Sequence, residues 1–469
     1  MSEAAMREGT LITYKSGVAV GRERFRDDGA ALVSDIQLGQ SVITVTLTRE
    51  PRRVRLDVGD GDGKSVERDV PAGAIVLENG SWAAYSLAAS QFPDAASPVA
   101  VDVLIPSLGA TAGGTIAVRP GEDGGRRVEV VIHGLQVEVD LDATGSVVAA
   151  RVPAQGIEAR IEGAPAPDPE APRSPPRGVI EEAFEETREG VALRGDLWLP
   201  ASAVDAVPVV VFLAGSGPTD RDANSSLGLR TDAYRLVAEA LAARGVASLR
   251  YDKRGVGKSG SNFDPATTVI DDFAADVLAV TARLRADPRF STLALLGHSE
   301  GGLLPLMIAE RAAPDVILLV AVAGRPLAVV LREQLARRLD PRALVDVDRV
   351  LSAVRCGAPP DPIPAPLAPL FAPTVRAFLR SALDLDPLPL LRAAKARVAI
   401  VQGAFDAQVT LVDARLLADA RPDATLTILP TMNHVLKEEA SAAMPQASYS
   451  DPTRPLAPGL GDILAAALR

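Results

Sequence analysis

The fold of this chain is decided by the stretch Gly297-His298-Ser299-Glu300-Gly301-Gly302. An apolar run at 292–296 precedes it, and a second apolar run at 303–309 follows it. This order predicts a strand, a tight turn and a helix, with Ser299 in the turn. Such a turn is strained, so only small residues fit two positions before and two positions after the serine, and its hydroxyl projects clear of the sheet. The stretch therefore predicts a nucleophilic serine, although the five-residue pattern alone also arises by chance in glycine-rich turns.

Length and composition limit the classes of protein to which the chain can belong. Its 469 residues suggest two or three domains, and a hydrophobic content of 47% is enough for a large core. The net charge of −11 argues against a nucleic-acid partner, because phosphate binding needs a basic face. Cys356 is the only cysteine, which excludes an intrachain disulfide and a thiolate metal cluster.

The sequence also bears on membranes and cellular compartment. No uninterrupted apolar run is long enough to span a membrane. Residues 1–8 have neither a basic start nor an apolar core, so no signal peptide is visible and a cytoplasmic protein is expected. A mature secreted or periplasmic chain with its signal removed would look the same. The sequence leaves a homo-oligomer open.

Residues 1–162 have the pattern of an all-β domain. Short alternating runs such as 42–47 and 128–132 recur, and Gly, Asp and Asn punctuate them. This spacing predicts an antiparallel sandwich or a half-closed barrel. Residues 163–178 are rich in proline and are predicted to form a semi-rigid linker, because proline interrupts both helices and interior strands.

From residue 179 to 469 the pattern changes to strands that alternate with helices. A hairpin is expected at 183–200, with its turn at Glu189-Gly190, and further strands at 209–213, 246–251, 292–296, 316–322, 398–401 and 425–429. Such alternation predicts a mostly parallel sheet covered on both faces. Between about 324 and 396 a helical, proline-rich insertion replaces the alternation. An insertion at this place predicts a cap over the strand ends, where open α/β sheets bind their ligands.

A serine nucleophile needs a base, and the chain has only three histidines. His133 lies in the β domain, and His298 lies inside the turn, which would direct it away from the neighbouring hydroxyl. His434 remains, just after the last predicted strand. Asp406 follows the strand at 398–401 and should reach the same sheet edge, where it would orient the histidine. Asp413 is the alternative acid, but it falls inside a predicted helix.

The predicted tetrahedral intermediate needs two hydrogen-bond donors for its oxyanion. The backbone N–H of Glu300, directly after the nucleophile, is the first. The second should come from the loop at 214–218, called here the oxyanion loop, with the N–H of Ser216 preferred and that of Gly217 as the alternative. The side chain of Glu300 is expected to anchor the turn.

Cofactor motifs are not complete in this sequence. The run 255–259 resembles a phosphate-binding loop, but such a loop requires glycine at 252, where Asp252 stands. The spacing Gly-x-Gly-x-x-Gly of a dinucleotide site occurs at 255–260, but no helix is expected to begin there, as such a site requires. The sequence therefore predicts neither a cofactor nor a metal.

Several motifs together resemble those of one protein family. They are 213–222, 251–260, 297–302, 402–409 and Asn433-His434. They look like α/β-hydrolases of the bacterial carboxylesterase type, near the serine aminopeptidase-like branch, over about 180–469. The family's usual His-Gly in the oxyanion loop is Ala214-Gly215 here, a change that leaves a backbone donor in place. The resemblance implies an α/β-hydrolase fold with a helical cap, and members with an extra N-terminal β domain imply a preference for short acyl chains.

These observations predict a serine carboxylesterase that hydrolyses small ester substrates through Ser299, His434 and Asp406. A peptidase or amidase with the same triad is the nearest alternative. It would need carboxylates that bind a substrate ammonium, and the sequence does not place such a pair. A non-catalytic binding protein is the alternative from another class, and the complete set of three residues argues against it.

Overall fold

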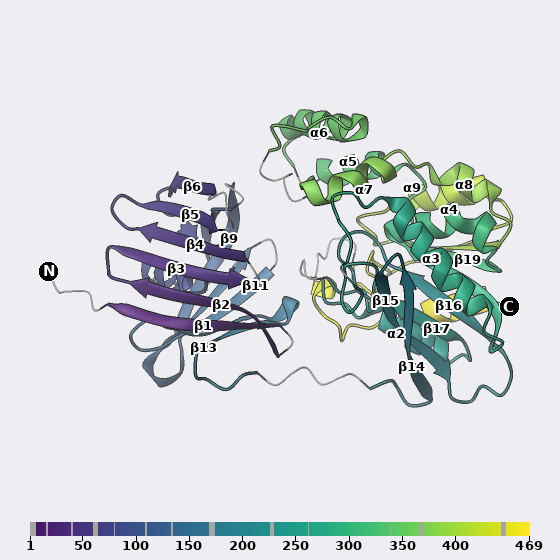
Figure 1. Ribbon diagram of the computed structural model, residues 1–469, viewed down its shortest axis with the longest axis horizontal. Coiled ribbons are helices and arrows are strands. Elements are labelled where there is room, and N and C mark those ends of the chain that lie inside the picture. The colour runs from purple at the N-terminus through teal and green to yellow at the C-terminus, as the bar shows by residue number, and fades with distance from the viewer. Residues whose placement is uncertain are drawn as a thin grey trace. The chain divides into compact units, whose positions relative to one another are not determined.

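The computed structural model describes the chain apart from residues 1–5, 16, 39–40, 60–63, 79, 108–109, 133–134, 168–173, 226–228, 261, 338, 365–366, 368–369 and 442–446 (Figure 1). His133 is therefore outside the described residues. The chain divides into two compact units, Met1–Arg173 and Ser174–Arg469, called here the N-terminal and C-terminal units. The division falls within the proline-rich segment 163–178.

The N-terminal unit is built on a 13-stranded sheet. Its strands are β1 (Arg7–Lys15), β2 (Val18–Asp27), β3 (Ala31–Leu38), β4 (Ser41–Thr48), β5 (Arg53–Gly59), β6 (Lys64–Asp69), β7 (Ile75–Val76), β8 (Val99–Ile105), β9 (Ala110–Pro120), β10 (Arg126–Ile132), β11 (Leu135–Leu141), β12 (Val147–Val152) and β13 (Ile157–Ile161). The predicted antiparallel β domain is confirmed, since every pairing except that of β7 with β8 is antiparallel.

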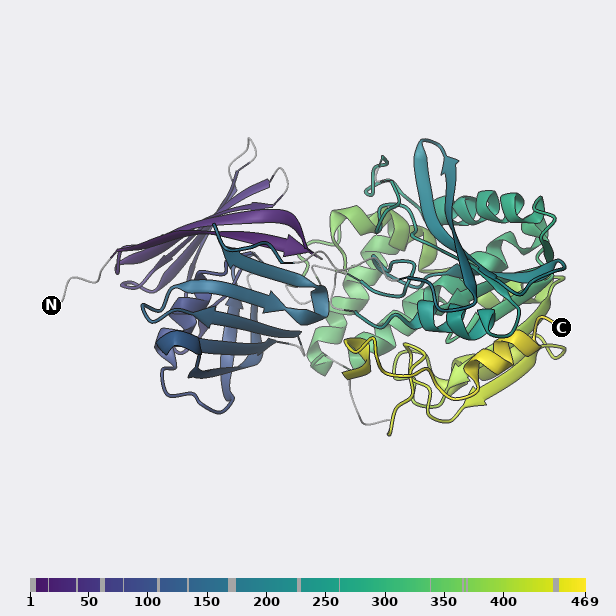
Figure 2. The same cartoon turned by 90° about the horizontal axis from the view of Figure 1, so that it is seen from below.

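The strands form one curved sheet and not two separate sheets. Across the sheet the strands follow the order β6-β5-β4-β3-β2-β1-β13-β12-β11-β10-β9-β8-β7. The first strand, β1, therefore pairs with the last, β13, near the middle of the sheet. Figure 2 shows β1–β6 in purple facing the later strands in blue. One apolar core lies between the two halves and includes Leu11, Val54, Val103 and Val139. This arrangement matches the half-closed barrel rather than the sandwich.

The N-terminal unit also contains a helix, α1 (Ala84–Gln91), where the sequence predicted only strands. That prediction was wrong because the segment is rich in alanine, which favours helix and packs closely at Ala84 and Ala88. The carboxylate of Glu23, wholly buried on β2, accepts the backbone N–H groups of Trp82 and Ala83 at 2.8 and 3.1 Å. A carboxylate at this position satisfies donors at the start of the helix.

The C-terminal unit is built on an eight-stranded, mostly parallel sheet. Its order is β14-β15-β17-β16-β18-β19-β20-β21, and only the pairings of β15 with β14 and β17 are antiparallel. The strands are β14 (Val179–Arg188), β15 (Val191–Pro200), β16 (Val207–Leu213), β17 (Ala247–Tyr251), β18 (Phe290–His298), β19 (Val316–Val320), β20 (Arg397–Gly403) and β21 (Thr425–Leu429). The expected hairpin is present, with Glu189 and Gly190 both at positive φ in its turn.

Helices cover both faces of this sheet, as expected from the alternation. They are α2 (Ala233–Ala242), α3 (Ile270–Arg285), α4 (Leu303–Ala312), α9 (Leu411–Ala420) and α10 (Leu460–Ala466). One core packs α2 and α10 against Val210 and Leu318, and other cores pack α3, α4 and α9 against the opposite face, including Val211 and Ile317. Burial on both faces explains why the central strands are continuous apolar runs.

The segment between β19 and β20 is helical. It contains α5 (Leu327–Ala336), α6 (Leu344–Cys356), α7 (Pro373–Ala382) and α8 (Pro387–Ala393), of which α8 was not expected. A separate apolar cluster that includes Val350 and Phe371 holds α5, α6 and α7 together. Within the described residues, no helix is long and apolar enough to cross a membrane.

Glu23 gives the N-terminal unit a predictable response to pH. Burial raises the pKa of Glu23 from 4.5 to about 7, so the folded state keeps a proton that the unfolded state releases. The contribution of Glu23 to the free energy of unfolding should therefore be complete below pH 4.5 and fall by up to about 1.4 kcal/mol per pH unit as the pH rises to 7. Glu23→Gln should abolish this dependence on pH. The free energy of unfolding is measured in urea at each pH, with the hydrogen-exchange protection of the α1 amides as the signal. Glu162→Gln, at an exposed site, should retain the dependence on pH, and an unchanged slope in Glu23→Gln contradicts the assignment.

Candidate active site

Ser299 lies in the predicted strand–turn–helix. It follows β18 directly, and a short 3₁₀ helix, Ser299–Gly302, leads into α4. Its φ of 55° is in the left-handed region, which is strained for a serine. A Cβ at Gly301 would stand 2.2 Å from the carbonyl oxygen of Leu213, and one at Gly297 would stand 2.4 Å from the Cα of Gly302. The turn therefore requires glycine at both positions.

The three side chains predicted as nucleophile, base and acid lie in one hydrogen-bonded chain. The Oγ of Ser299 is 3.1 Å from Nε2 of His434, and Nδ1 of His434 is 2.8 Å from Oδ2 of Asp406. His434 and Asp406 are buried. All three follow strands at the same edge of the parallel sheet, namely β18, β20 and β21. The tertiary structure thus assembles residues that are 135 positions apart in the sequence.

Asp406 is held firmly toward His434. Its Oδ1 accepts the backbone N–H groups of Gln408 and Val409 at 2.8 and 2.9 Å, while the amide of Gln402 donates to Oδ2 at 3.1 Å. These bonds fix the carboxylate so that one oxygen remains directed at the imidazole. Such an arrangement favours the tautomer of His434 that carries its proton on Nδ1 and offers Nε2 to the serine.

Asp413, the alternative acid, has a different position. It lies on α9, where it forms a capping box with Thr410, and it is fully buried in an ion pair with Arg325 at 2.8 Å. This pairing lowers the pKa of Asp413 against the opposing effect of burial. The carboxylate thus anchors the start of α9 and does not contact His434.

The oxyanion loop lies against Ser299. A Cβ at Gly215 would stand only 3.0 Å from the Cβ of Ser299. Among the described residues, the N–H groups of Ser216 and Gly217 donate no hydrogen bond to the protein. The hydroxyl of Ser216 donates to Oε2 of Glu300 at 2.9 Å. The Glu300 side chain therefore ties the oxyanion loop to the turn, in keeping with the anchoring role expected from the sequence.

Lys253 is a further polar residue of this region that the sequence did not reveal. Its ammonium donates to the carbonyl oxygen of Gly215 at 2.5 Å. Burial lowers the pKa of Lys253 to about 8, against the effect of the Glu300 carboxylate, and burial raises the pKa of Glu300. The ammonium of Lys253 and the carboxyl group of Glu300 both contact the oxyanion loop, at Gly215 and Ser216. No sequence signal marks Lys253, because its partners are 38 or more residues away.

His298 points away from the hydroxyl of Ser299, as predicted, and it has a definite set of partners. The hydroxyl of Tyr234 lies 2.8 Å from Nδ1 of His298, and Nε2 of His298 lies 2.8 Å from the backbone carbonyl oxygen of His434. The Tyr234 hydroxyl also contacts the backbone N–H of Gly215. Burial lowers the pKa of His298 to about 3, so the ring is neutral. A neutral ring can donate from Nε2 to the His434 carbonyl and accept at Nδ1 from Tyr234.

Ion pairs support the loop that follows the oxyanion loop. Arg221 pairs with Asp252 at 2.7 Å and with Asp196 at 2.6 Å, and Asp222 pairs with Arg250. Asp252 also accepts the backbone N–H of Lys258 at 2.8 Å. The run 255–259 therefore wraps around a carboxylate, which accounts for its glycines without a bound phosphate.

The helical insertion contacts the loop that carries Asp406. From α5, Gln334 donates to the carbonyl oxygen of Gln408 at 3.1 Å, and Arg337 donates to that of Ala407 at 2.5 Å. These two bonds connect the insertion to the loop that orients His434.

The chain is similar to known proteins over part of its length. Residues 227–343 match the family described as serine aminopeptidase, S33. The chain is 28% identical over 270 residues to esterase EstD of Thermotoga maritima, an alignment that covers 56% of this chain and 62% of that protein. The chain thus spans less than two thirds of that relative.

The C-terminal unit has the α/β-hydrolase fold. Its strand order, the turn at Ser299 and the positions of His434 and Asp406 after later strands carry this conclusion. Among solved structures, a ferulic-acid complex of Est1E from Butyrivibrio proteoclasticus is similar with a TM-score of 0.39 and 18% identity, over 55% of this chain and 93% of that one. A Pyrococcus furiosus esterase has the same TM-score and identity, over 55% of this chain and 84% of that one.

The hydrogen bonds of Tyr234 in the α/β-hydrolase domain can be tested through stability. Tyr234→Phe should leave Nδ1 of His298 and the N–H of Gly215 without a partner in a buried place, and should lower the free energy of unfolding by about 1–3 kcal/mol. Urea unfolding measures this loss. Tyr251→Phe is the matched control, because Tyr251 is also buried but makes no recorded side-chain hydrogen bond within the described chain. Equal losses in the two variants would show that the Tyr234 hydroxyl contributes nothing specific.

Proposed function

We propose that the chain is a serine carboxylesterase that hydrolyses short-chain acyl esters through a covalent acyl-enzyme. The observation that carries the proposal is the hydrogen-bonded chain from Ser299 through His434 to the buried Asp406. The similarity to esterase EstD supports an ester substrate. The preference for short acyl chains rests on the resemblance to esterases with an extra β domain.

Acylation begins with proton transfer from Ser299 to His434. Nε2 of His434 is within hydrogen-bonding distance of the serine Oγ and accepts its proton as the oxygen attacks the ester carbonyl. Asp406 stabilises the imidazolium that forms and keeps the ring in position. His434 then gives the proton to the departing alkoxide, which leaves as the alcohol.

The negative charge of the tetrahedral intermediate is held by backbone donors. The N–H of Glu300 follows the nucleophile, and the N–H of Ser216, with that of Gly217 as the alternative, lies on the loop packed against Ser299. Donors fixed in advance need no reorganisation as charge develops, and the loss of one such donor costs about 10²–10³ in kcat. The bond from Ser216 to Glu300 keeps this loop in place.

Deacylation repeats these steps with water in place of the serine. His434 removes a proton from a water molecule that attacks the acyl-enzyme, and the same donors hold the second intermediate. Ser299 then recovers its proton from His434 as the acid product leaves. The residues described here account for every proton transfer, so the proposed cycle uses no cofactor or metal.

The main alternative is an aminopeptidase with the same triad, which the matching family description favours. Such an enzyme needs a carboxylate free to bind a substrate ammonium. Glu300 is the carboxylate nearest to Ser299 in sequence, but it already accepts from Ser216 and lies under the influence of the Lys253 ammonium. A second ammonium would be repelled there, which favours the ester substrate.

The proposed chemistry predicts a specific pattern of labelling and turnover. An organophosphate should label Ser299 stoichiometrically, and Ser299→Ala should abolish labelling and lower kcat by about 10⁴–10⁶. With the unlabelled enzyme, nitrophenyl acetate and butyrate should be hydrolysed faster than long-chain esters and aminoacyl nitroanilides, measured as kcat/KM. Faster turnover of the anilides would overturn the esterase assignment, and failure to label Ser299 would overturn the enzyme assignment.

The two candidate acids can be separated by one pair of variants. Asp406→Asn should lower kcat by about 10⁴ at neutral pH, because the amide stabilises the wrong tautomer of His434 and cannot balance the imidazolium. Asp413→Asn should leave kcat within a few-fold of the parent and lower the unfolding free energy, since Arg325 loses its buried partner. Steady-state kinetics and urea unfolding of both variants show which aspartate acts with His434. A large kcat loss in Asp413→Asn alone would reverse the assignment.

A further inference from the structure

The N-terminal unit contains a cavity at the place where its sheet fails to close. The two edge strands of the sheet, β6 and β7, are consecutive in the chain and are separated only by residues 70–74. This short connection is tied to the β4–β5 turn, because the N–H of Val70 donates to the carbonyl oxygen of Arg52 at 3.0 Å and Arg52 donates to that of Ala74 at 2.8 Å. Between this turn and α1 lies a cavity of about 350 Å³.

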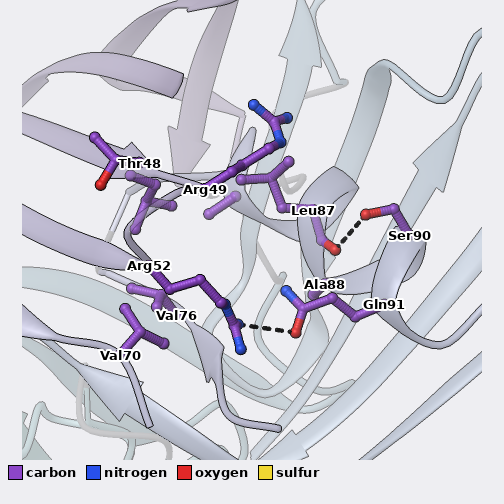
Figure 3. Close-up of a pocket in the computed structure, with 11 residues that line it drawn as sticks. Thr48, Arg49, Arg52, Val70, Val76, Leu87, Ala88, Ser90 and Gln91 are labelled. Atoms are coloured by element: carbon purple, nitrogen blue, oxygen red, sulfur yellow. Dashed lines mark hydrogen bonds between the residues drawn. The ribbon is translucent and has the colours of Figure 1, made fainter. Parts of the chain in front are cut away.

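The walls of the cavity are amphipathic. Its apolar residues are Leu47, Val70, Val76, Ala84, Leu87 and Ala88. Figure 3 shows Val70 and Val76 beside Arg52, with Leu87 and Ala88 on the helix opposite. Its volume is typical of pockets that hold small molecules, which are mostly apolar with a few polar groups that set orientation.

The two arginines at the cavity differ in their partners. Arg49 pairs at 2.8 Å with the buried Asp27, a carboxylate that it shares with Arg7, and within the described chain its buried Nη1 has no hydrogen-bond partner. Arg52 donates only to neutral oxygens, those of Ala74 and of the Gln91 side chain at 3.1 Å. Among the described residues, no carboxylate lies within ion-pairing distance of the Arg52 guanidinium. In a chain with a net charge of −11, a positive group without a counter-ion beside an apolar cavity calls for an anionic ligand.

We propose that this cavity binds a monocarboxylate with a saturated hydrocarbon tail. The carboxylate would pair with the guanidinium of Arg52, and the tail would lie against Val76, Leu87 and Ala88. Both parts of the cavity are then used, since the charge satisfies Arg52 and the tail displaces water from the apolar wall. The site lies entirely within the N-terminal unit, so the proposal is independent of the function assigned to Ser299.

The test is titration calorimetry of octanoate on the full chain after organophosphate treatment, which removes Ser299 as a competing binding place. Octanoate should bind at one saturable site, hexanoate about tenfold more weakly because it lacks two CH₂ groups, and acetate not at all. Arg52→Gln should weaken octanoate binding about tenfold or more and leave the binding of neutral octanol unchanged. Absence of a saturable octanoate site would overturn the proposal.

Arg53→Gln is the matched control. Arg53 is the next residue along the chain but is exposed and pairs with Asp69 and Glu67, away from the cavity. It should bind octanoate as the parent does. If octanoate binding were weakened equally in Arg53→Gln and Arg52→Gln, or weakened in neither, the proposed site at Arg52 would be overturned. This comparison stands even if the organophosphate does not label Ser299, so failure here and failure of the proposed function are distinguishable.

Discussion

The left-handed backbone at Ser299 is the constraint on which the rest of the C-terminal unit depends. The strain of that conformation is tolerated because the surrounding glycines allow the turn to pack directly against Leu213, the last residue of the neighbouring strand. This close approach places Ser299 beside the oxyanion loop, where a Cβ at Gly215 would stand only 3.0 Å from the serine Cβ. A side chain at Gly301 would push the turn at Ser299 away from Leu213 and the oxyanion loop, and Ser299 would lose its position beside that loop.

Hydrogen bonds to buried groups then hold the loops around this turn in a fixed relation. His298 joins the turn to the loop of His434 on one side and, through Tyr234, to the oxyanion loop on the other. Glu300 and Lys253 make a second connection to the oxyanion loop. Because unsatisfied polar groups are costly in such a place, these contacts specify one arrangement of the three loops. The relative positions of Ser299, His434 and Asp406 thus depend on all the loops at the carboxyl ends of these strands.

In the N-terminal unit the main constraint is that a long sheet has two edge strands with unpaired backbone groups. It folds its 13 strands around one core but leaves β6 and β7 unpaired with each other, and α1 packs at the gap. The buried Glu23 is accommodated because the first N–H groups near α1 need an acceptor. The cavity beside Arg52 follows from the same incomplete closure, since a helix covers a sheet edge less completely than another strand does.

The sequence by itself determined the parallel sheet, the strained turn, and the identities of Ser299, His434 and Asp406 as candidates. It could do so because apolar runs and glycines are local signals, and because only three histidines were available as the base. It missed α1, where alanine-rich helix competed with surrounding strand patterns, and it gave no sign of Lys253, Tyr234 or the cavity at Arg52. Only the tertiary structure revealed Lys253, Tyr234 and the cavity, because each depends on contacts between side chains far apart in the chain, which no local sequence pattern records.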